Sequence, residues 1–395
     1  MMTDHRIITM AHDPIVIAGA VRTPMGAFQG NLASLSATDL GAATIRASLA
    51  RSGMEPGIVD EVFMGCVLPA GLGQAPARQA ALGAGMPDSV PCTTVNKVCG
   101  SGMKAIMLAA DAVSAGSADI VVAGGMESMS NAPYLLGKAR AGYRLGHGQL
   151  IDHMFLDGLE DAYDRGRAMG TFAEDTAEHY QFTRDAQDAY ALESLRRARS
   201  AIATGAFAEE ISAIDGMSQD EQPGRAKPEK IPHLKPAFRR DGTVTAANSS
   251  SISDGAASLV VTRMSIAEQR GLTPQAVIRG HAGHAQEPAW FTTAPIPATR
   301  KLLEKTGWVI QEVDLFEINE AFAVVAMAAM RDLDLPHEKV NVNGGACALG
   351  HPIGCSGARI VVTLIAALKA RGLKRGIASL CIGGGEATAI AVELV

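Results

Sequence analysis

The sequence predicts an α/β fold in which two similar halves enclose central helices. Three observations predict it: a long internal repeat, alternating helical and strand-like segments in each repeat, and one helical segment that is apolar on nearly every side. Alternation of helices and strands is typical of α/β folds. With 395 residues, 47% of them apolar and 19% charged, the chain can bury a large core.

The internal repeat relates residues 43–63 to residues 298–316. In both segments seven residues separate a glycine from an aspartate, Asp60 or Asp314, and a Ser-Gly pair follows, its glycine 42 or 43 residues after the aspartate. Each match is weak alone, but the shared spacing extends over a whole supersecondary unit. Two copies of one α/β unit are therefore expected.

In the first half, residues 93–98 are strand-like and a Gly-Ser-Gly turn follows Cys99. Apolar side chains then recur at helical spacing over residues 103–113, and residues 119–123 form a further strand that we expect to end at Gly124 and Gly125. In the second half, strands are expected at 313–318 and 377–380. The helix after Gly357 is apolar nearly all round, which only a helix buried between layers tolerates. Two sheets enclosing central helices satisfy this pattern.

A more charged region interrupts the first half. It contains a helical pattern at residues 183–197 and a polar segment at 219–235 with Pro and Gly breaks, and we expect it to cover a site. The predicted organisation is an N-terminal core half (residues 1–127 and 252–273), an inserted loop domain (128–251) and a C-terminal core half (274–395).

Charge and composition exclude several classes of protein. The formal charge is 35 − 41 = −6 with no basic block, so the electrostatic pattern of a nucleic-acid binder is missing. The longest uncharged apolar runs, 321–330 and 360–368, fall short of the roughly 18 residues that span a bilayer, so no membrane association is expected. Six cysteines in a chain of this length do not indicate a disulfide scaffold. No secretion or peroxisomal signal is evident either, so we expect a cytoplasmic location.

Cys99 has the position of a nucleophile, between a strand and the Gly-Ser-Gly start of a helix. The helix dipole and free amides there should lower the pKa of the thiol. His351 lies among glycines and a proline, on a rigid loop suited to a general base, and Cys381 opens a Cys-Ile-Gly-Gly-Gly segment whose amides can face an oxyanion. Each residue also has a structural interpretation: a buried core cysteine, a hydrogen-bonded histidine, and for Asn319 a helix cap.

Metal and nucleotide chemistry find little support in the motifs. There is no Cys-x-x-Cys pair, and Cys347, His351 and Cys355 lie in a Gly/Pro-rich stretch without helical alignment, so no metal site is expected. No phosphate-binding Gly-x-x-x-x-Gly-Lys-Ser/Thr segment and no dinucleotide-binding glycine fingerprint is present. Nucleotide hydrolysis and nicotinamide redox chemistry are thereby disfavoured.

Taken together, the motifs resemble the thiolase family of acetyl-CoA acyltransferases over nearly the whole chain. The matching segments are Val-Arg-Thr-Pro at 21–24, Asn-Lys-Val-Cys-Gly-Ser-Gly at 96–102, Gly-Gly-Met-Glu-Ser-Met-Ser at 124–130, Asn-Glu-Ala-Phe-Ala at 319–323, the His351 loop through 359, and Cys-Ile-Gly-Gly-Gly at 381–385. The resemblance implies two similar halves packed as five αβαβα layers with an inserted loop domain, and a homodimer or homotetramer active in fatty acid metabolism.

The resemblance also implies roles. Cys99 would accept the acyl group, and His351 would activate the thiol of Cys99. Cys381 would take the proton from the α-carbon of the second acyl-CoA or return it. His351 and a water held by Asn319 would polarise that thioester, and the amides of Cys99 and Gly383 would bind the tetrahedral oxyanion. No metal or redox cofactor is implied, since coenzyme A thioesters are the substrates. Five further positions would contact coenzyme A: Met169, Phe238, Ala246, Ser250 and Phe322.

Two departures and two alternatives accompany this resemblance. Short-chain biosynthetic members carry a histidine where this sequence has Ala168, which leaves room for acyl chains longer than acetyl. The residues before Met10 extend beyond the usual start, so Met1, Met2 or Met10 could be the initiator.

The alternatives are a 3-oxoacyl synthase, which lacks the second reactive cysteine, and a non-catalytic lipid carrier, which need not keep Cys99, Asn319, His351 and Cys381 together.

Overall fold

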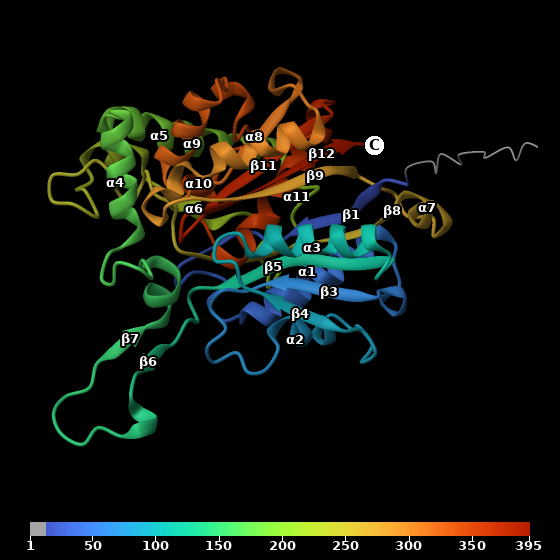
Figure 1. Ribbon diagram of the computed structural model, residues 1–395, viewed down its shortest axis with the longest axis horizontal. Coiled ribbons are helices and arrows are strands. Elements are labelled where there is room, and N and C mark those ends of the chain that lie inside the picture. Colours follow the sequence, from blue (N-terminus) through green and yellow to red (C-terminus); the bar gives the residue numbers. More distant parts are fainter. Residues whose placement is uncertain (1–12) are drawn as a thin grey trace, which may run out of the picture.

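The computed structural model describes residues 13–395, so the expectation about Met1, Met2 and Met10 lies outside the described part. Helices and strands alternate through both halves and build five layers (Figure 1). The first half contains β1 (Ile15–Arg22), α1 (Ala37–Ser52), β3 (Glu61–Gly65), α2 (Pro76–Gly83), β4 (Cys92–Val95), α3 (Ser101–Ala115), β5 (Ile120–Ser128) and β8 (Ser253–Arg263). The second contains β9 (Ala276–Ala285), α8 (Pro295–Thr306), β10 (Leu315–Ile318), α9 (Ala323–Asp332), α10 (Ala346–Leu349), α11 (Ile353–Arg371), β11 (Arg375–Ile382) and β12 (Glu386–Leu394).

Strand pairing follows the same pattern in both halves. In the first half the order is β4-β3-β5-β8-β1, with β3 parallel to β4 and β5 and the remaining pairs antiparallel. In the second the order is β10-β11-β12-β9, and a parallel bridge between Phe316 and Val340 stands where β4 stands in the first half. The predicted duplication is confirmed. The two sheets are not separate, however, because β1 and β9 pair at their starts and join the strands into one path.

The repeated aspartates explain why the two copies share a spacing. Each lies just before the first parallel strand of its half. A carboxylate oxygen of Asp60 accepts hydrogen bonds from the backbone N–H groups of Asp119 and Ile120, both at 2.9 Å. Asp314 does the same for Lys374 and Arg375, at 2.9 and 2.8 Å. Each aspartate thus fixes the start of the neighbouring parallel strand, β5 or β11.

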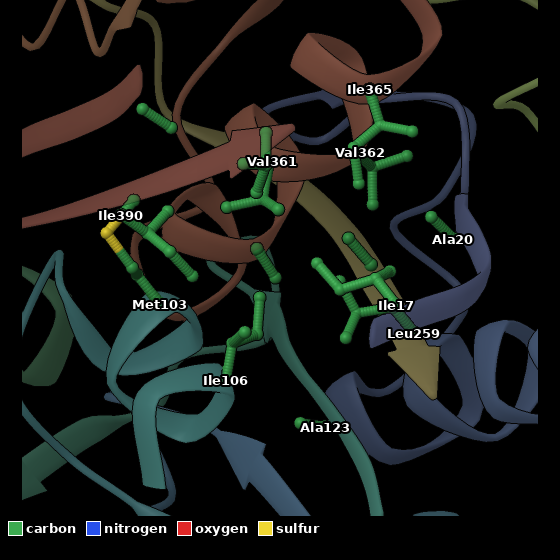
Figure 2. Packing of buried hydrophobic residues seen from close by; sticks show 14 of the residues in the cluster. Ile17, Ala20, Met103, Ile106, Ala123, Leu259, Val361, Val362, Ile365 and Ile390 are labelled. Atoms are coloured by element: carbon green, nitrogen blue, oxygen red, sulfur yellow. The ribbon is translucent and has the colours of Figure 1, made fainter. Parts of the chain in front are cut away.

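The central layer consists of α3 and α11, which lie side by side between the two sheets. Met103 and Ile106 of α3 face Val361 and Ile365 of α11, with β-strand residues such as Leu259 closing the cluster (Figure 2). Strand residues alternate between this cluster and the outer ones under α1 and α2 or under α8 and α9. Two segments, Val98–Ala115 and Ile353–Arg371, are long and apolar enough to cross a membrane, and their burial in this layer accounts for that composition.

Strand β5 differs from its prediction, because it continues through Gly124 and Gly125 to Ser128 instead of ending at them. A Cβ on Gly124 would stand 2.1 Å from the carbonyl oxygen of Ala257, and one on Gly125 would stand 2.1 Å from that of Gly354. The glycines are thus required by close packing within the strand and against the start of α11, rather than by a turn.

The inserted region covers one end of the layers. It contains β6 (Tyr134–Leu136), β7 (Leu150–Asp152), α4 (Met169–Tyr180), α5 (Arg184–Thr204) and α6 (Glu221–Arg225). The predicted helix at 183–197 corresponds to α5, which Thr183 caps and which extends to Thr204. The polar segment at 219–235 is partly ordered as α6 and a 3-10 helix, Pro228–His233. Strands β6 and β7 form a hairpin that projects from the rest of the molecule (Figure 1).

Candidate active site

Cys99 lies in a tight turn immediately before α3. The turn closes through hydrogen bonds from the N–H of Gly100 to the carbonyl of Lys97 and from the N–H of Ser101 to that of Val98, both 3.0 Å long. Val98 has φ 47°, a left-handed conformation that costs a β-branched residue energy and so depends on its surroundings. The Ser101 hydroxyl also donates to the Val98 carbonyl at 2.6 Å. These bonds hold the cysteine at the start of the helix.

The predicted lowering of the Cys99 pKa is wrong. Burial raises the pKa of the thiol to about 11, although hydrogen bonds from the amides of Gly383 and of Cys99 itself act in the predicted direction. Desolvation of the thiolate outweighs the two amides because the charged form loses more hydration than two donors return. The resting nucleophile is therefore a neutral thiol, and it needs a base.

Cys381 lies inside β11, one residue from its end, rather than after the strand as the sequence suggested. Burial raises its pKa well above that of a free thiol, and the charge of Cys99 adds to the rise, so the two sulfurs are within electrostatic reach of each other. The turn between β11 and β12 contains Gly383, Gly384 and Gly385, the last two at φ 92° and 87°. This glycine turn is what presents the Gly383 amide to the sulfur of Cys99.

His351 lies between α10 and α11, where its backbone N–H donates to the carbonyl of Ser251 at 3.0 Å. Its Nδ1 lies 2.5 Å from the hydroxyl oxygen of Ser356, and that hydroxyl donates to the carbonyl of Pro352 at 3.0 Å. With its one proton so engaged, the hydroxyl accepts the N–H at Nδ1. Nε2 then carries the lone pair, and it is buried without a partner.

Burial and a neighbouring charge keep His351 neutral. Burial and then the nearby charge of Arg359 lower its pKa to about 3. The imidazole is therefore neutral at physiological pH, with Nε2 free to take a proton.

Glycine contacts between α3 and α11 bring these groups to one end of the central layer. A Cβ on Gly102 would stand 2.8 Å from the N of Ala358, and one on Gly357 would stand 2.4 Å from the N of Met103. Only glycine permits such an approach of two helices. Cys99 precedes the first glycine and His351 precedes the second, so this crossing sets the nucleophile loop beside the base loop.

Asn319 follows β10 and lies beside His351. Its amide nitrogen is 3.5 Å from Nδ1 of the imidazole, and its N–H donates to the carbonyl of Ser379 in β11 at 3.0 Å. Nη2 of the buried Arg359 donates to the Asn319 side-chain oxygen at 3.3 Å, and Glu317 pairs with Nη1 at 3.4 Å. Because the arginine holds the oxygen, the NH₂ group of Asn319 is turned toward the histidine.

Comparison with known proteins agrees with this geometry. The thiolase N-terminal domain model matches residues 15–265, and the thiolase C-terminal domain model matches residues 272–394. The chain belongs to the thiolase family. Two curated relatives are acetyl-CoA acetyltransferase 2 of Arabidopsis thaliana, 52% identical over 96% of this chain and 97% of that protein, and acetyl-CoA acetyltransferase of Escherichia coli, 51% identical over 96% and 98%.

Solved structures extend the comparison to the fold. A thiolase from Ascaris suum in complex with coenzyme A is 44% identical, with a TM-score of 0.93 over 97% of this chain and all of that one. Acetyl-CoA acetyltransferase of Bacillus anthracis gives a TM-score of 0.94 at 44% identity, over 97% of this chain and 99% of the other. The predicted thiolase fold is thereby confirmed.

A buried carboxylate that was not predicted joins the segment after β3 to the start of α11, beside the His351 loop of this thiolase. Glu127, in β5, accepts hydrogen bonds from the N–H groups of Val67 (3.0 Å), Leu68 (3.1 Å) and Gly354 (2.9 Å). Burial raises its pKa to about 7. A charged residue inside a run of buried strand residues was the available sequence signal, because a buried carboxylate has to be hydrogen-bonded.

A cavity of about 290 Å³ opens beside the loop domain of the thiolase. Ala246, one of the five residues predicted to contact coenzyme A, lines it together with Ser251 and Cys347. Two cations not assigned from the sequence, Lys227 and Lys230, also line it. Both lysines belong to the polar segment 219–235, to which no coenzyme A contact was assigned from the sequence.

The other predicted coenzyme A contacts connect this side of the molecule to the catalytic glycines. The backbone N–H of Ser250 donates to the carbonyl of Ala321 at 2.9 Å, and Ala321 directly precedes Phe322. The Phe322 ring packs edge-on against Phe238 at 5.9 Å, and Met169 Cε lies 3.4 Å from where a Cβ of Gly383 would be. Of the five predicted residues, Ala246 lines the cavity, Phe238 and Phe322 pack together beside Ser250, and Met169 borders Gly383. Among residues 13–395, no group of three or more His, Cys, Asp or Glu side chains is arranged to hold a metal ion.

Proposed function

We propose that this thiolase catalyses the reversible condensation of two acyl-CoA molecules, with acetyl-CoA as the principal one, to 3-oxoacyl-CoA and coenzyme A. The observation that carries the proposal is the environment of Cys99. Its sulfur accepts hydrogen bonds from the backbone N–H groups of Gly383 and Cys99, and its charge affects the pKa of Cys381. The neutral His351 lies at the same end of the central layer.

Acylation of Cys99 begins when Nε2 of His351 takes the thiol proton. The thiolate attacks the thioester carbonyl, and the amides of Cys99 and Gly383 donate to the oxyanion that develops. Collapse of this intermediate expels coenzyme A, which leaves with the proton from His351. A pKa of about 11 for Cys99 makes the base necessary, since at neutral pH about one thiol in 10⁴ would ionise unaided.

Condensation uses the second cysteine. Cys381 first gives its thiol proton to Nε2 of His351, and the resulting thiolate removes a proton from the α-carbon of the second acyl-CoA. The protonated Nε2 and a water held by Asn319 stabilise the enolate oxygen. The carbanion attacks acyl-Cys99, a C–C bond forms, the Cys99–acyl bond breaks, and the Cys99 thiolate takes the proton from His351, so that both thiols are restored. These steps need proton transfer and oxyanion stabilisation alone, so coenzyme A thioesters suffice and no further cofactor is proposed.

The cavity beside the loop domain is proposed as the entry for coenzyme A. Lys227 and Lys230 supply positive charge for its phosphates, and the wall from Ser250 through Phe322 and Phe238 to Met169 leads the pantetheine arm toward Gly383. Ala168, the cap residue of α4, adds no bulk at this wall, which supports acceptance of acyl groups beyond acetyl.

Two substitutions test the chemistry. Cys99→Ser should abolish thiolysis of acetoacetyl-CoA, and retention of the wild-type rate would refute the nucleophile assignment. Cys381→Ala should leave Cys99 open to acetylation by [14C]acetyl-CoA but block condensation. If Cys381→Ala instead prevented acetylation of the enzyme, the two roles would be reversed.

We further propose a cytoplasmic homotetramer of fatty acid metabolism. Six free cysteines suit a reducing compartment. The projecting β6–β7 hairpin exposes 65% of Tyr134, 97% of Leu145 and 70% of Leu150, an apolar surface suited to contact with another copy. Light scattering of the wild type and of Leu145→Asp tests this: a tetramer reduced to a smaller species supports it, whereas a wild-type monomer or dimer refutes it.

A further inference from the structure

An ion pair connects the two loops that carry the oxyanion amides. Lys97 Nζ pairs with a carboxylate oxygen of Glu386, and both side chains are partly exposed, at 26% and 39%. Lys97 stands two residues before Cys99, and Glu386 stands three residues after Gly383. The pair thus spans 289 residues of sequence and joins the N-terminal half to the C-terminal half at the reacting sulfur.

The two loops meet at the reacting sulfur, where the N–H of Gly383 donates to Cys99. A Cβ on Gly100 would stand 2.3 Å from Cδ1 of Ile382, and one on Gly383 would stand 3.9 Å from Cγ1 of Val98. These contacts involve residues 98–100 and 382–383, whereas the ion pair joins residues 97 and 386, farther along each loop. The pair therefore restrains rotation of one loop relative to the other.

The surroundings of Glu386 make Lys97 its specific partner for this purpose. The same groove is lined by three further lysines, on α3 and α8, and by His281 on β9 (the lysines are Lys104, Lys301 and Lys305). The three lysines attract the carboxylate, but among the lysines of this groove only Lys97 belongs to the Cys99 turn. Loss of Lys97 would leave Glu386 free to turn toward the other lysines, carrying the glycine turn with it.

We propose that Lys97 and Glu386 are a positioning pair that sets the separation between the amides of Cys99 and Gly383. The inference rests on the proposed function, in which these amides bind the oxyanion. An exposed ion pair adds little to folding stability, whereas losing an oxyanion-hole donor costs about 10²–10³-fold in kcat. The pair should therefore affect turnover much more than stability.

A double-mutant cycle of Lys97→Met, Glu386→Gln and the combined variant tests the proposal. Each single substitution should lower kcat for acetoacetyl-CoA thiolysis by about 10-fold, less than the loss of a donor, with KM for coenzyme A unchanged. The double variant should lose no more than either single one, and Lys97→Arg should recover most of the activity. Alkylation of Cys99 by iodoacetamide should slow in parallel, because the thiolate shares the same two amides.

The pair Lys369 and Glu209 offers a matched control, since its atoms are 2.7 Å apart, both side chains are exposed, and Lys369 lies at the end of α11 opposite His351. Lys369→Met and Glu209→Gln should keep full activity. Wild-type kcat in Lys97→Met, or losses that multiply in the double variant, would overturn the pairing. If the wild type does not cleave acetoacetyl-CoA, the proposed function fails, and the alkylation rates still decide the pair: equal rates in wild type and Lys97→Met refute it.

Discussion

Substituting Gly125 by alanine should uncouple the two halves of the molecule at the catalytic end. A Cβ at this position would stand 2.1 Å from the carbonyl oxygen of Gly354 and 3.0 Å from Cα of Gly102. The first contact is backbone, so no flexible side chain can move aside. The start of α11, the start of α3, or both must shift away from β5 by about 1 Å to restore van der Waals contact.

The magnitude follows from those two neighbours. Overpacking of a core costs about 1–3 kcal/mol and occasionally more, and a rigid backbone contact belongs at the upper end. The larger effect should be on catalysis, because Gly102 lies three residues after Cys99 and Gly354 three residues after His351. A displacement of about 1 Å between reacting groups can cost about 10²-fold in rate.

Thermal unfolding and steady-state thiolysis measure the two effects. Gly125→Ala should lower Tm by several degrees and kcat by about 10²-fold. Gly57→Ala is the control: no atom lies within 4 Å of its added Cβ, and its φ is not positive, so Tm and kcat should stay at the wild-type values. A Gly125→Ala enzyme with unchanged Tm and kcat would show that the close approach of β5 to α11 does not set the site.

Three further outcomes follow. Ser356→Ala removes the acceptor at Nδ1 of His351 and should reduce kcat about 10-fold in steady-state assays, less than the 10²–10⁴-fold that a general base supplies, and Ser356→Thr should restore it. With a pKa of about 11, alkylation of Cys99 should accelerate roughly tenfold per pH unit from pH 7 to 10, and a plateau below pH 9 would contradict that pKa. His351 has a pKa of about 3 when folded against 6.5 as its ordinary value, so the unfolded chain binds the extra proton and stability falls as pH decreases below 6.5. In denaturant titrations, the stability lost between pH 6.5 and 5.5 should be smaller by about 1 kcal/mol in His351→Asn than in the wild type.

The sequence predicted those features that depend on local pattern or on repetition. The duplication could be found because Asp60 and Asp314 perform one task, fixing the start of a parallel strand, and a repeated task keeps a repeated spacing. The buried layer could be found because α11 is apolar on nearly every side. Cys99, His351 and Cys381 stood out because glycines surround all three, and glycine marks places where backbones approach closely.

Features that depend on distant contacts could not be predicted. Strand β5 was ended too early, because Gly124 and Gly125 signal a turn locally, while their partners Ala257 and Gly354 lie more than a hundred residues away. The direction of the Cys99 pKa was wrong for a related reason. Helix position is local information, but the burial that dominates is a property of the assembled layers. The Lys97–Glu386 pair has no sequence signature at all.

The duplicated serines show how two similar halves yield unlike catalytic groups. Ser101 and Ser356 occupy matching positions in the repeat, and each hydroxyl donates to a backbone carbonyl of the preceding loop, that of Val98 or Pro352. The acceptor side of each hydroxyl is used differently. Ser101 accepts the backbone N–H of Lys97 at 2.8 Å, which fixes the turn that carries the nucleophile, whereas Ser356 accepts from the imidazole of His351.

The same serine position thus accepts a hydrogen bond from a backbone N–H in the first half and from a side chain in the second. In the first half it orients the Cys99 turn, and in the second it selects the tautomer whose Nε2 is free. In the first half the group that donates to the serine is a peptide N–H four residues before it, and in the second half it is a histidine five residues before it. The spacing from aspartate to glycine is also longer by one residue in the second half, 43 against 42. The two halves thus use the same serine position for different tasks: one orients the acyl acceptor Cys99 and the other orients its base His351.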